Sequence, residues 1–175
     1  DGQPLPFKRS KEQRRRLQYI FQNPYSSLDP RLTVRRLIAE PLQFYFGLSG
    51  QALADKIRSL LAAVELDESL LAQKPRSLSG GQCQRIGIIR ALAAEPDVLV
   101  CDEPTSALDA FNQIQVLHLL KRLQQQSNIG LIFISHALEV VYQLADDVFV
   151  FHRGQLVETG TKDQVYTHPQ AAYTR

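Results

Sequence analysis

The stretch VLVCDEPTSALD, residues 98–109, decides the fold. Its first four residues, Val98–Cys101, form a continuous apolar run of the kind found in strands buried within a parallel sheet. Two adjacent acids, Asp102 and Glu103, follow the run directly, and Asp109 stands where its side chain can cap a following helix. An apolar strand that leads through a short loop into a helix indicates an α/β protein with a parallel sheet.

The segments on either side repeat this alternation of strand and helix. Further strands are predicted at Leu17–Phe21 and at Gly130–Ile134, the second as a buried strand. Apolar residues at helical spacing, together with capping and turn residues, predict the remaining elements. Five helices are predicted: from Thr33 to Glu40, where Pro41 ends the pattern; after Ser49-Gly50, with Ile57, Leu60, Leu61 and Val64 on one face; from the glycines after Ser79 through Ala94; from Asp109 to about Gln125; and at Ala137–Leu144. A hairpin of Val148–Phe151 and Gln155–Glu158 is predicted around Arg153-Gly154. A last helix is predicted from the capping box at Thr161–Gln164.

Polar residues follow each of the three strands that are expected to form the sheet. Gln22 comes after the first strand, Asp102 and Glu103 after the second, and Ser135 with His136 after the third. In an open parallel sheet, ligands bind beyond the carboxyl ends of the strands. These side chains are therefore the first candidates for a functional site.

The acid pair suits phosphate chemistry assisted by a metal ion. Burying a carboxylate is costly unless it is paired or binds a cation, and Mg²⁺ prefers one or two carboxylates together with phosphate oxygens. Asp102 then suits a role beside magnesium, and Glu103 suits the activation of a water molecule. On the pair alone, an acidic helix cap on a surface loop is an equally good interpretation.

A second candidate site is the sequence LSGGQ, Leu78–Gln82. Gly80 and Gly81, after Ser79, let the backbone approach a ligand closely. The helix that follows presents free backbone N–H groups and the positive end of its dipole, which together favour a phosphate. A serine-capped helix after a flexible turn is the alternative that this motif alone leaves open.

His136 is a weaker candidate when it is considered by itself. A histidine can contact a phosphate or hold a water molecule at neutral pH, although a single histidine is more often structural. Its neighbour Ser135 is adjacent in sequence, which is the wrong arrangement for a serine–histidine nucleophile pair. The sequence therefore does not predict a hydrolase triad.

Composition indicates an ordinary globular protein. The 175 residues are 44% hydrophobic, enough for one domain with a sizeable core, and the net charge of +2 gives no indication of a nucleic-acid partner. Cys83 and Cys101 lack zinc-site spacing and are expected to be reduced thiols in the cytosol. No apolar run approaches the roughly 20 residues of a membrane span, and none resembles a signal peptide. The basic run Lys8–Arg16 is expected to be solvated surface.

Taken together, these motifs resemble the ATP-binding cassette (ABC) ATPases. The resemblance is carried by Gln22, by Leu78–Gln82 with Arg85, by Val98–Asp109 and by His136, in this order and with fitting spacings. It covers nearly the whole chain. LSGGQ followed by an apolar strand and DEPTSALD is among the most specific signals that a sequence can carry.

A narrower resemblance concerns one branch of this family. The sequence FQNPYSSLDPR, Phe21–Arg31, is similar to that of the importers of oligopeptides, dipeptides and nickel, as are His168-Pro169 and Tyr173–Arg175 near the end. The resemblance implies an importer ATPase for peptides or related small solutes. It does not identify the cargo, and the direction of transport depends on the branch alone.

The resemblance implies catalytic roles at the strand ends. Gln22 corresponds to the glutamine that reaches Mg²⁺ and the attacking water. Asp102 corresponds to the Walker B aspartate on the magnesium side, and Glu103 to the catalytic base. His136 corresponds to the switch histidine at the γ-phosphate of ATP.

The LSGGQ segment corresponds to the signature of the family. Ser79, Gly80, Gly81 and Gln82 would cap the γ-phosphate of an ATP molecule held by a second cassette. Asp109 would close the D-loop, which crosses to that second subunit. The implied partners are a second ABC ATPase subunit, identical or paralogous, the transmembrane permease subunits and, indirectly, a substrate-binding protein. The implied location is peripheral, at the cytoplasmic face of the cell membrane.

The resemblance also implies a fold and a division of the chain. The fold is an incomplete P-loop NTPase-type α/β core with an inserted all-α signature subdomain. Residues 1–22 would be the end of the N-terminal core, residues 23–95 the helical subdomain and residues 96–175 the C-terminal α/β core. The aromatic residues Phe44–Phe46 lie in the predicted helical part, where core packing is expected, with contact to a membrane subunit as the alternative.

One motif of the family is missing from the sequence. The phosphate loop G-x-x-x-x-G-K-[ST] binds the phosphates of ATP through its backbone N–H groups and its lysine, and no glycine in these 175 residues is followed by lysine. We therefore expect the sequence to be truncated at its N-terminus and the chain by itself to be inactive. Two alternatives stay open, a non-transport ABC ATPase of the DNA-repair or translation type and a non-catalytic truncated cassette.

Overall fold

The computed structural model of the protein describes residues 8–175. The chain divides into two compact units, the first ending at Ile134 and the second covering Ser135–Arg175. The first unit contains the parallel sheet and most of the helices, and the second contains a hairpin and two short helices. The division of the chain into segments 1–22, 23–95 and 96–175 stays a prediction.

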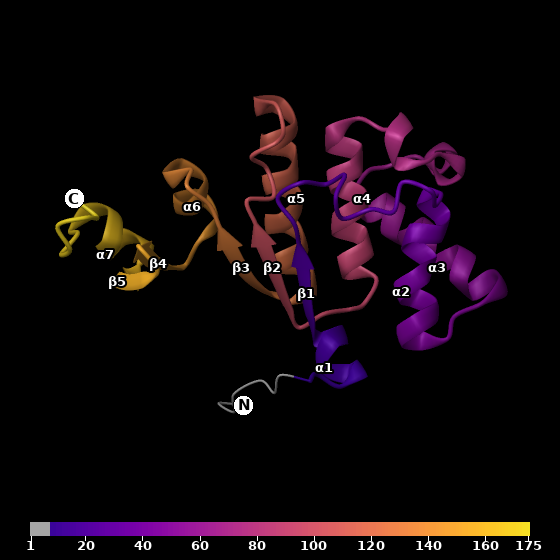
Figure 1. The fold of residues 1–175 in the computed structure, drawn as a ribbon, viewed down its shortest axis with the longest axis horizontal. Helices are drawn as coiled ribbons and strands as arrows, with labels where there is room; N and C mark the ends of the chain where they lie inside the picture. The colour runs from indigo at the N-terminus through magenta and orange to yellow at the C-terminus, as the bar shows by residue number, and fades with distance from the viewer. Residues whose placement is uncertain (1–7) are drawn as a thin grey trace. The chain divides into compact units, whose positions relative to one another are not determined.

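The sheet of the first unit consists of three parallel strands in the order β1-β2-β3 (Figure 1). They are β1 (Leu17–Ile20), β2 (Val98–Asp102) and β3 (Gly130–Ile134). Leu17 pairs with Val98, which pairs with Gly130, so the three strands run in register. The α/β fold with a parallel sheet is confirmed, and all three strands lie where the apolar runs predict them.

The two faces of this sheet differ in burial. Ile20, Leu99 and Cys101 are buried on one face, in the same core cluster as residues of the neighbouring helices. On the other face Tyr19 is exposed, and so is Ile132, which is 52% accessible. The prediction that Gly130–Ile134 is a buried strand is therefore wrong, because β3 lies at a sheet edge and only one of its faces is packed.

Helices of the first unit supply the rest of its core. Buried residues of α2, α3 and α4 belong to one hydrophobic cluster, which also takes in residues of α5. The elements are α1 (Lys11–Arg16), α2 (Val34–Phe46), α3 (Gly50–Ala63), the short 3₁₀ segments η1 (Glu68–Ala72) and η2 (Pro75–Ser77), α4 (Gly80–Leu92) and α5 (Ala110–Ser127).

Helix α2 is longer than the sequence predicts. It passes through Pro41 and ends at Gly47, which adopts the left-handed conformation with φ of 66°. Proline inside a helix removes one backbone hydrogen bond. Continuing the helix buries Leu42 beside Ile38, one turn earlier, and Pro41 itself is buried. The prediction that Pro41 ends the helix is wrong because this packing offsets the lost bond.

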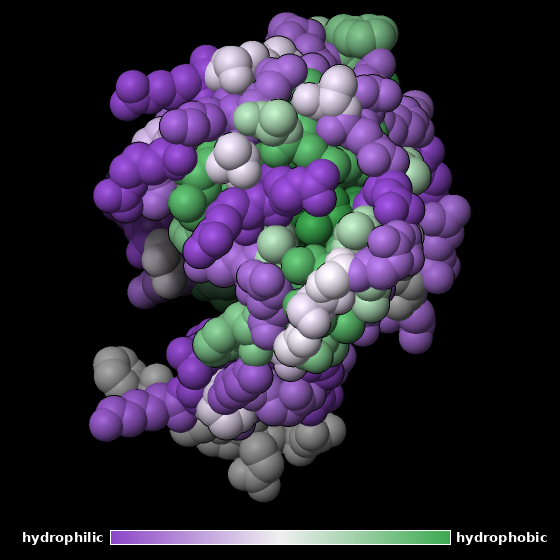
Figure 2. Space-filling view, turned by 90° about the vertical axis from the view of Figure 1, so that its right-hand side faces the viewer, coloured by the Kyte–Doolittle hydropathy of each residue, from purple (hydrophilic) through white to green (hydrophobic). Residues whose placement is uncertain are grey.

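The extended α2 carries an aromatic cluster at its end, and this cluster is not core. Phe44 is 52% accessible and Phe46 is 38% accessible. Figure 2 looks at the side that carries α2 and α3 and shows apolar surface among polar side chains. The expectation of core packing is therefore wrong for these two residues, although Phe44 and Tyr45 contact each other edge to face.

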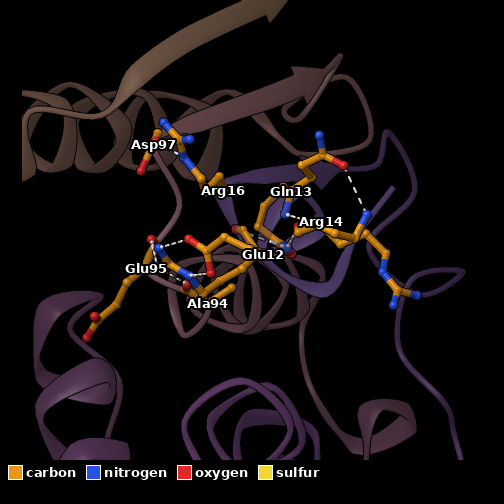
Figure 3. Close-up of polar contacts among 10 residues, drawn as sticks. Glu12, Gln13, Arg14, Arg16, Ala94, Glu95 and Asp97 are labelled. Carbon is orange, nitrogen blue, oxygen red and sulfur yellow. Dashed lines mark hydrogen bonds and ion pairs between the residues drawn. The ribbon is translucent and has the colours of Figure 1, made fainter. Parts of the chain in front are cut away.

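The basic run forms a short helix, α1, rather than purely solvated chain. Ser10 caps it in a reciprocal pair with Gln13. Arg15 donates to both oxygens of Glu12 and to the backbone carbonyls of Ala94 and Glu95, at 3.2 and 2.8 Å (Figure 3). These carbonyls lie just past the end of α4, where a cation is favourable. The run therefore anchors the approach to β1, in addition to exposing charge.

The second unit agrees with its predicted elements. It consists of α6 (Leu138–Leu144), β4 (Asp147–His152), β5 (Gln155–Thr161) and α7 (Lys162–Thr167), with β4 and β5 antiparallel. The turn residues Arg153 and Gly154 have φ of 50° and 79°, the positive values that a tight hairpin needs. The capping box of α7 is present as predicted.

Candidate functional site

The structure brings two of the predicted catalytic side chains together. Gln22 follows β1 and Glu103 follows β2, and because these strands are parallel neighbours their carboxyl ends meet at one edge of the sheet. The Gln22 Nε2 amide donates a hydrogen bond of 2.9 Å to Glu103 Oε2. This contact fixes the Gln22 side chain beside the Glu103 carboxylate. The sequence predicted only that the two residues lie at the same edge of the sheet.

The backbone at Glu103 has an unusual conformation. Its φ of 42° lies in the left-handed region, which is uncommon for a residue with a side chain. Three hydrogen bonds hold it there: the Glu103 amide donates to the Ile134 carbonyl at 2.9 Å, and the Ser106 amide and hydroxyl donate to the Glu103 carbonyl at 3.2 and 3.1 Å. Such conformations cost free energy and persist only where the surrounding structure holds them in place. They are concentrated at functional sites.

Asp102 has a partner that the sequence analysis missed. The Tyr19 hydroxyl donates to Asp102 Oδ2 at 2.6 Å, across the β1–β2 pair. The hydrogen bond to the carboxylate raises the pKa of Tyr19, with a further contribution from partial burial. The signal for this contact is the strand register, in which Tyr19 pairs with Val100, so the two polar groups extend from the same face.

The LSGGQ segment forms the start of α4 rather than a flexible turn. Ser79 is the N-cap, its hydroxyl accepts from the Gln82 amide at 3.2 Å, and the Gln82 side chain accepts from the Ser79 amide at 2.9 Å. Gly80 and Gly81 therefore lie in the first helical turn, where backbone N–H groups lack intrahelical acceptors. This turn can receive an anion, and Gln82 stabilises its geometry.

A close contact joins the start of α4 to the start of α5. A methyl group on Gly81 would come within 2.4 Å of Asn112 Oδ1, whereas one on Gly80 would meet only Leu108 at an ordinary 3.6 Å. Asn112 is held in turn by Asp109, which accepts from the Asn112 backbone amide at 3.0 Å and from its side-chain amide at 2.6 Å. These two hydrogen bonds, the backbone one first, lower the pKa of Asp109.

Asp109 is thereby confirmed as the N-cap of α5, and Asn112 joins the set of residues at the signature. Sequence reasoning did not select Asn112, since its role depends on the approach of two helix starts that are about 30 positions apart in the chain. The available local signal was its place three residues after a capping aspartate, where a side chain can return to the cap.

His136 lies in the second unit, close after the end of β3. Its side chain is exposed, and the neighbouring Ser135 hydroxyl accepts a 3.0 Å hydrogen bond from the Ala137 amide. The structure thus places His136 at the predicted end of a strand. Its role at a γ-phosphate stays a prediction.

The strand-end residues fit a magnesium ion that also binds a nucleotide. Glu103 accepts a hydrogen bond from the Gln22 amide, Asp102 precedes it in the chain, and carboxylate oxygens are ligands that Mg²⁺ takes. Within residues 8–175 no group of three or more His, Cys, Asp and Glu side chains could hold a metal alone.

Comparison with known proteins identifies the class. The family model described as "ABC transporter" matches residues 1–106, and the chain belongs to this family. None of the helices in the described part of the chain is long and apolar enough to cross a membrane.

Individual relatives narrow the resemblance. The chain is 47% identical over 166 residues to the oligopeptide transport ATP-binding protein OppF of Salmonella typhimurium, covering 94% of this chain and 50% of that protein. It is 44% identical over 165 residues to the dipeptide transport ATP-binding protein DppF of Escherichia coli, covering 94% and 49%. The chain therefore spans about half the length of the curated relatives it matches.

Solved structures give the same assignment. The ATP-binding cassette MJ0796, in a dimeric post-hydrolysis state with ADP and Pi, matches with a TM-score of 0.75 and 30% identity over 86% of this chain and 65% of that chain. The structure of cbiO1 from Clostridium perfringens, part of the ABC transporter complex cbiONQ, matches with a TM-score of 0.83 and 26% identity over 96% and 66%. The expected P-loop NTPase-type fold is thereby confirmed.

Proposed function

We propose that the whole protein to which these residues belong is the ATP-hydrolysing subunit of an ABC importer for peptides or related small solutes. The observation that carries this proposal is the hydrogen bond between Gln22 and Glu103, at the carboxyl ends of two parallel strands. The relatives that transport oligopeptides and dipeptides support the choice of cargo class.

The proposed chemistry is the attack of water on the γ-phosphate of ATP. Glu103 accepts the proton of the attacking water, and a positioned base of this kind contributes about 10²–10⁴-fold in rate. Gln22 donates its amide N–H to Glu103, which leaves its carbonyl oxygen to orient the water. Mg²⁺, held on the Asp102 side, would neutralise charge on the phosphate oxygens.

The signature acts in a dimer in this proposal. Ser79, Gly80 and Gly81 present the start of α4 to the γ-phosphate of ATP bound by a second cassette, and Asp109 lies beside them through Asn112. His136 is assigned separately, as the switch histidine at a γ-phosphate. Support comes from the anion-binding geometry of the helix start and from the dimeric MJ0796 neighbour with ADP and Pi. The further partners are membrane permeases, with the ATPase at the cytoplasmic membrane face.

The test is Mg²⁺-dependent ATP turnover by the whole protein, with Glu103→Gln measured beside it. We expect the substitution to lower turnover by about 10²–10⁴-fold with no change in the melting curve. Turnover that survives Glu103→Gln would remove Glu103 from the role of base. Tyr19→Phe, which removes the hydrogen bond to Asp102 and leaves Glu103 in place, tests the neighbouring carboxylate separately.

A non-catalytic cassette is the second candidate, and ATP turnover by the whole protein tests it. The sequence contains no phosphate loop of the form G-x-x-x-x-G-K-[ST]. If the whole protein also lacks ATP turnover when permeases and partner cassette are present, the remaining role of these residues is to supply Ser79–Gly81 to the ATP of a partner. Turnover by the whole protein would exclude this candidate.

A further inference from the structure

The third residue of α5, Asn112, makes a different cap contact from the third residues of α1, α4 and α7. In those three helices the third residue is a glutamine, whose side chain accepts a hydrogen bond from the backbone amide of the N-cap residue. In α5 the shorter Asn112 instead donates its side-chain amide to the Asp109 carboxylate at 2.6 Å. Its oxygen, Oδ1, is therefore available to face a neighbouring element.

That neighbouring element is the start of α4. A methyl group on Gly81 would lie 2.4 Å from Asn112 Oδ1, 2.9 Å from its Cγ and 3.4 Å from its Cβ. The Asn112 side chain thus lies along the Gly81 backbone over its whole length. Gly81 is the second residue of α4, so its amide is one of the backbone N–H groups that lack an intrahelical acceptor. Asn112 therefore borders the backbone that is assigned to the γ-phosphate in the proposed function.

Both oxygens of the Asp109 carboxylate are engaged inside this chain. Oδ1 accepts from the Asn112 backbone amide at 3.0 Å, and Oδ2 accepts from the Asn112 side-chain amide at 2.6 Å. The first hydrogen bond is the helix cap, which a serine or an asparagine would also make. The second has no part in capping and fixes the Asn112 side chain. An aspartate, with two acceptor oxygens, can do both at once.

A second contact joins the same two helices one turn further on. Arg85 donates from one nitrogen to the Gln115 side-chain oxygen and from another to the Val64 carbonyl at 3.3 Å. Arg85 comes four residues after Gly81, and Gln115 comes three residues after Asn112, so the two contacts lie on the same faces of α4 and α5. The Arg85 contact holds the bodies of the helices together. The Asn112 contact reaches the first turn of α4, where the N–H groups lie.

We propose that Asn112 is a positioning residue for the signature. Held by Asp109, it fixes the backbone of Gly81 and so the N–H groups that bind the γ-phosphate of ATP on a second cassette. The Asp109 carboxylate acts on this phosphate through Asn112 and not through a contact of its own with the second cassette. This inference rests on the proposed function, which places the phosphate of a second cassette at the start of α4.

Two simpler roles would leave the same contacts in the structure. If Asn112 only stabilised the packing of α4 against α5, any residue that joins these helices would matter equally for the binding of a second cassette. If the Asp109 carboxylate contacted the second cassette directly, its loss would weaken that binding whether or not Asn112 is present. The variants below separate these two roles from the proposed one.

The experiment measures how Mg-ATP promotes the association of the whole protein with the second cassette of its transporter, by sedimentation velocity. The parent protein carries Glu103→Gln, and every variant is made in this parent, so that ATP is consumed slowly. Asn112→Ala removes the contacts with Asp109 and Gly81. Gln115→Ala is the matched control, because it removes the other side-chain hydrogen bond between α4 and α5 and leaves the first turn of α4 untouched. Melting temperatures without nucleotide report stability.

We expect Asn112→Ala to weaken the association that depends on ATP by about tenfold. Its melting temperature should change little, because the higher helix propensity of alanine offsets the lost hydrogen bond. Gln115→Ala should change the association by less than about twofold. If Asn112→Ala stays within about twofold of the parent, the proposal is overturned. An equal loss in Gln115→Ala would also overturn it, because the effect would then come from the packing of α4 against α5.

A double-mutant cycle tests the route from Asp109. Asp109→Ser keeps a capping oxygen for the Asn112 backbone amide and removes the oxygen that holds the Asn112 side chain. We expect it to weaken the association when it is made alone and to cause no further loss when it is added to Asn112→Ala, because both changes act on one contact. Additive losses would contradict the proposal, since Asp109 would then have its own contact with the second cassette.

A further variant covers the case in which Asn112→Ala fails to fold. Asn112→Asp keeps the shape of the side chain, but it cannot donate to Asp109 and its charge repels that carboxylate. We expect it to weaken the association by about tenfold as well, and unchanged association would contradict the proposal. The parent protein is the separate check on the proposed function. If Mg-ATP does not promote association of the parent, the proposed function fails, whereas a parent that associates equally well with and without the Asn112 substitutions overturns this inference alone.

Discussion

The strand-end residues and the signature are built in different ways. At the carboxyl ends of β1 and β2, functional side chains contact one another, as Gln22 does Glu103, and they extend from the surface of a sheet. At the start of α4, the candidate function belongs to the backbone, and side chains such as Gln82 and Asn112 shape that backbone. A functional side chain at the strand ends can be substituted without repacking its neighbours. At the start of α4, a substitution that alters function also alters the packing of the helix start.

The two regions differ in how they respond to substitution. A carboxylate in the sheet region can be replaced by an amide of the same shape, and the loss is then purely chemical. Gly81 in the signature region has no such replacement, because an added methyl group meets Asn112. Substitutions should therefore separate activity from stability in the first region and combine them in the second.

The largest expected effect is on the affinity for ATP, because the proposed roles of both regions depend on bound ATP. The 175-residue chain by itself should have no useful affinity for ATP, with a Kd weaker than about 1 mM, because neither region supplies the backbone loop and lysine that hold the phosphates. Isothermal titration of the chain with Mg-ATP checks this. Micromolar binding would show that the two regions suffice as a nucleotide site.

Glu103→Gln comes next and tests the sheet region. Turnover of the whole protein should fall by about 10²–10⁴-fold. The melting temperature should not move, because the amide keeps the volume of the carboxylate. A parallel loss of stability would show that this region, like the signature, depends on packing.

Gly81→Ala is the corresponding test of the signature region. The added methyl group meets Asn112 and must displace it from Asp109, so we expect a loss of about 1–3 kcal/mol in the free energy of unfolding. Chemical denaturation measures this loss, and turnover should fall with it.

Two controls define the cause of that loss. Gly80→Ala has room and should gain up to about 1 kcal/mol from helix propensity. Adding Asn112→Ala to Gly81→Ala should restore stability, because it removes the atoms that clash. If the double variant stays as unstable as the single one, the contact with Asn112 is not the reason for glycine.

A smaller effect is expected at Ser79, where cap and ligand roles coincide. Ser79→Ala removes the N-cap of α4 and should cost about 1 kcal/mol, whereas Ser79→Asn keeps a capping oxygen and should cost little. Both should lower turnover, since neither presents a serine hydroxyl to phosphate. Thermal unfolding and phosphate release, measured together, separate the two roles; equal stability of both variants would contradict the capping role.

Tyr19→Phe should have the smallest effect of the series. Tyr19 is exposed, and losing its hydrogen bond to Asp102 should change the free energy of unfolding by no more than about 0.5 kcal/mol. Denaturation curves of the two proteins provide the measurement. A larger change would show that Asp102 depends on this bond for its position.

Most of the fold follows from local sequence patterns. Three apolar runs predict the three strands, and the capping residues Asp109 and Thr161 predict the starts of two helices, because these signals act within a few residues. The errors are tertiary. Pro41 did not end α2, and Gly130–Ile134 is not buried, since both outcomes depend on which residues pack against the element rather than on the element itself.

The candidate site shows the same division. The amino-acid sequence by itself determined the family, the strand ends that carry Gln22, Asp102 and Glu103, and the helix start at Ser79, because residue type and short spacing define them. Only the tertiary structure decided that Tyr19 contacts Asp102, that Asn112 contacts Gly81 and that the buried Gln84 amide has no hydrogen-bond partner among residues 8–175. These contacts join residues 30 or more positions apart or depend on full burial, and no local pattern encodes which surfaces meet.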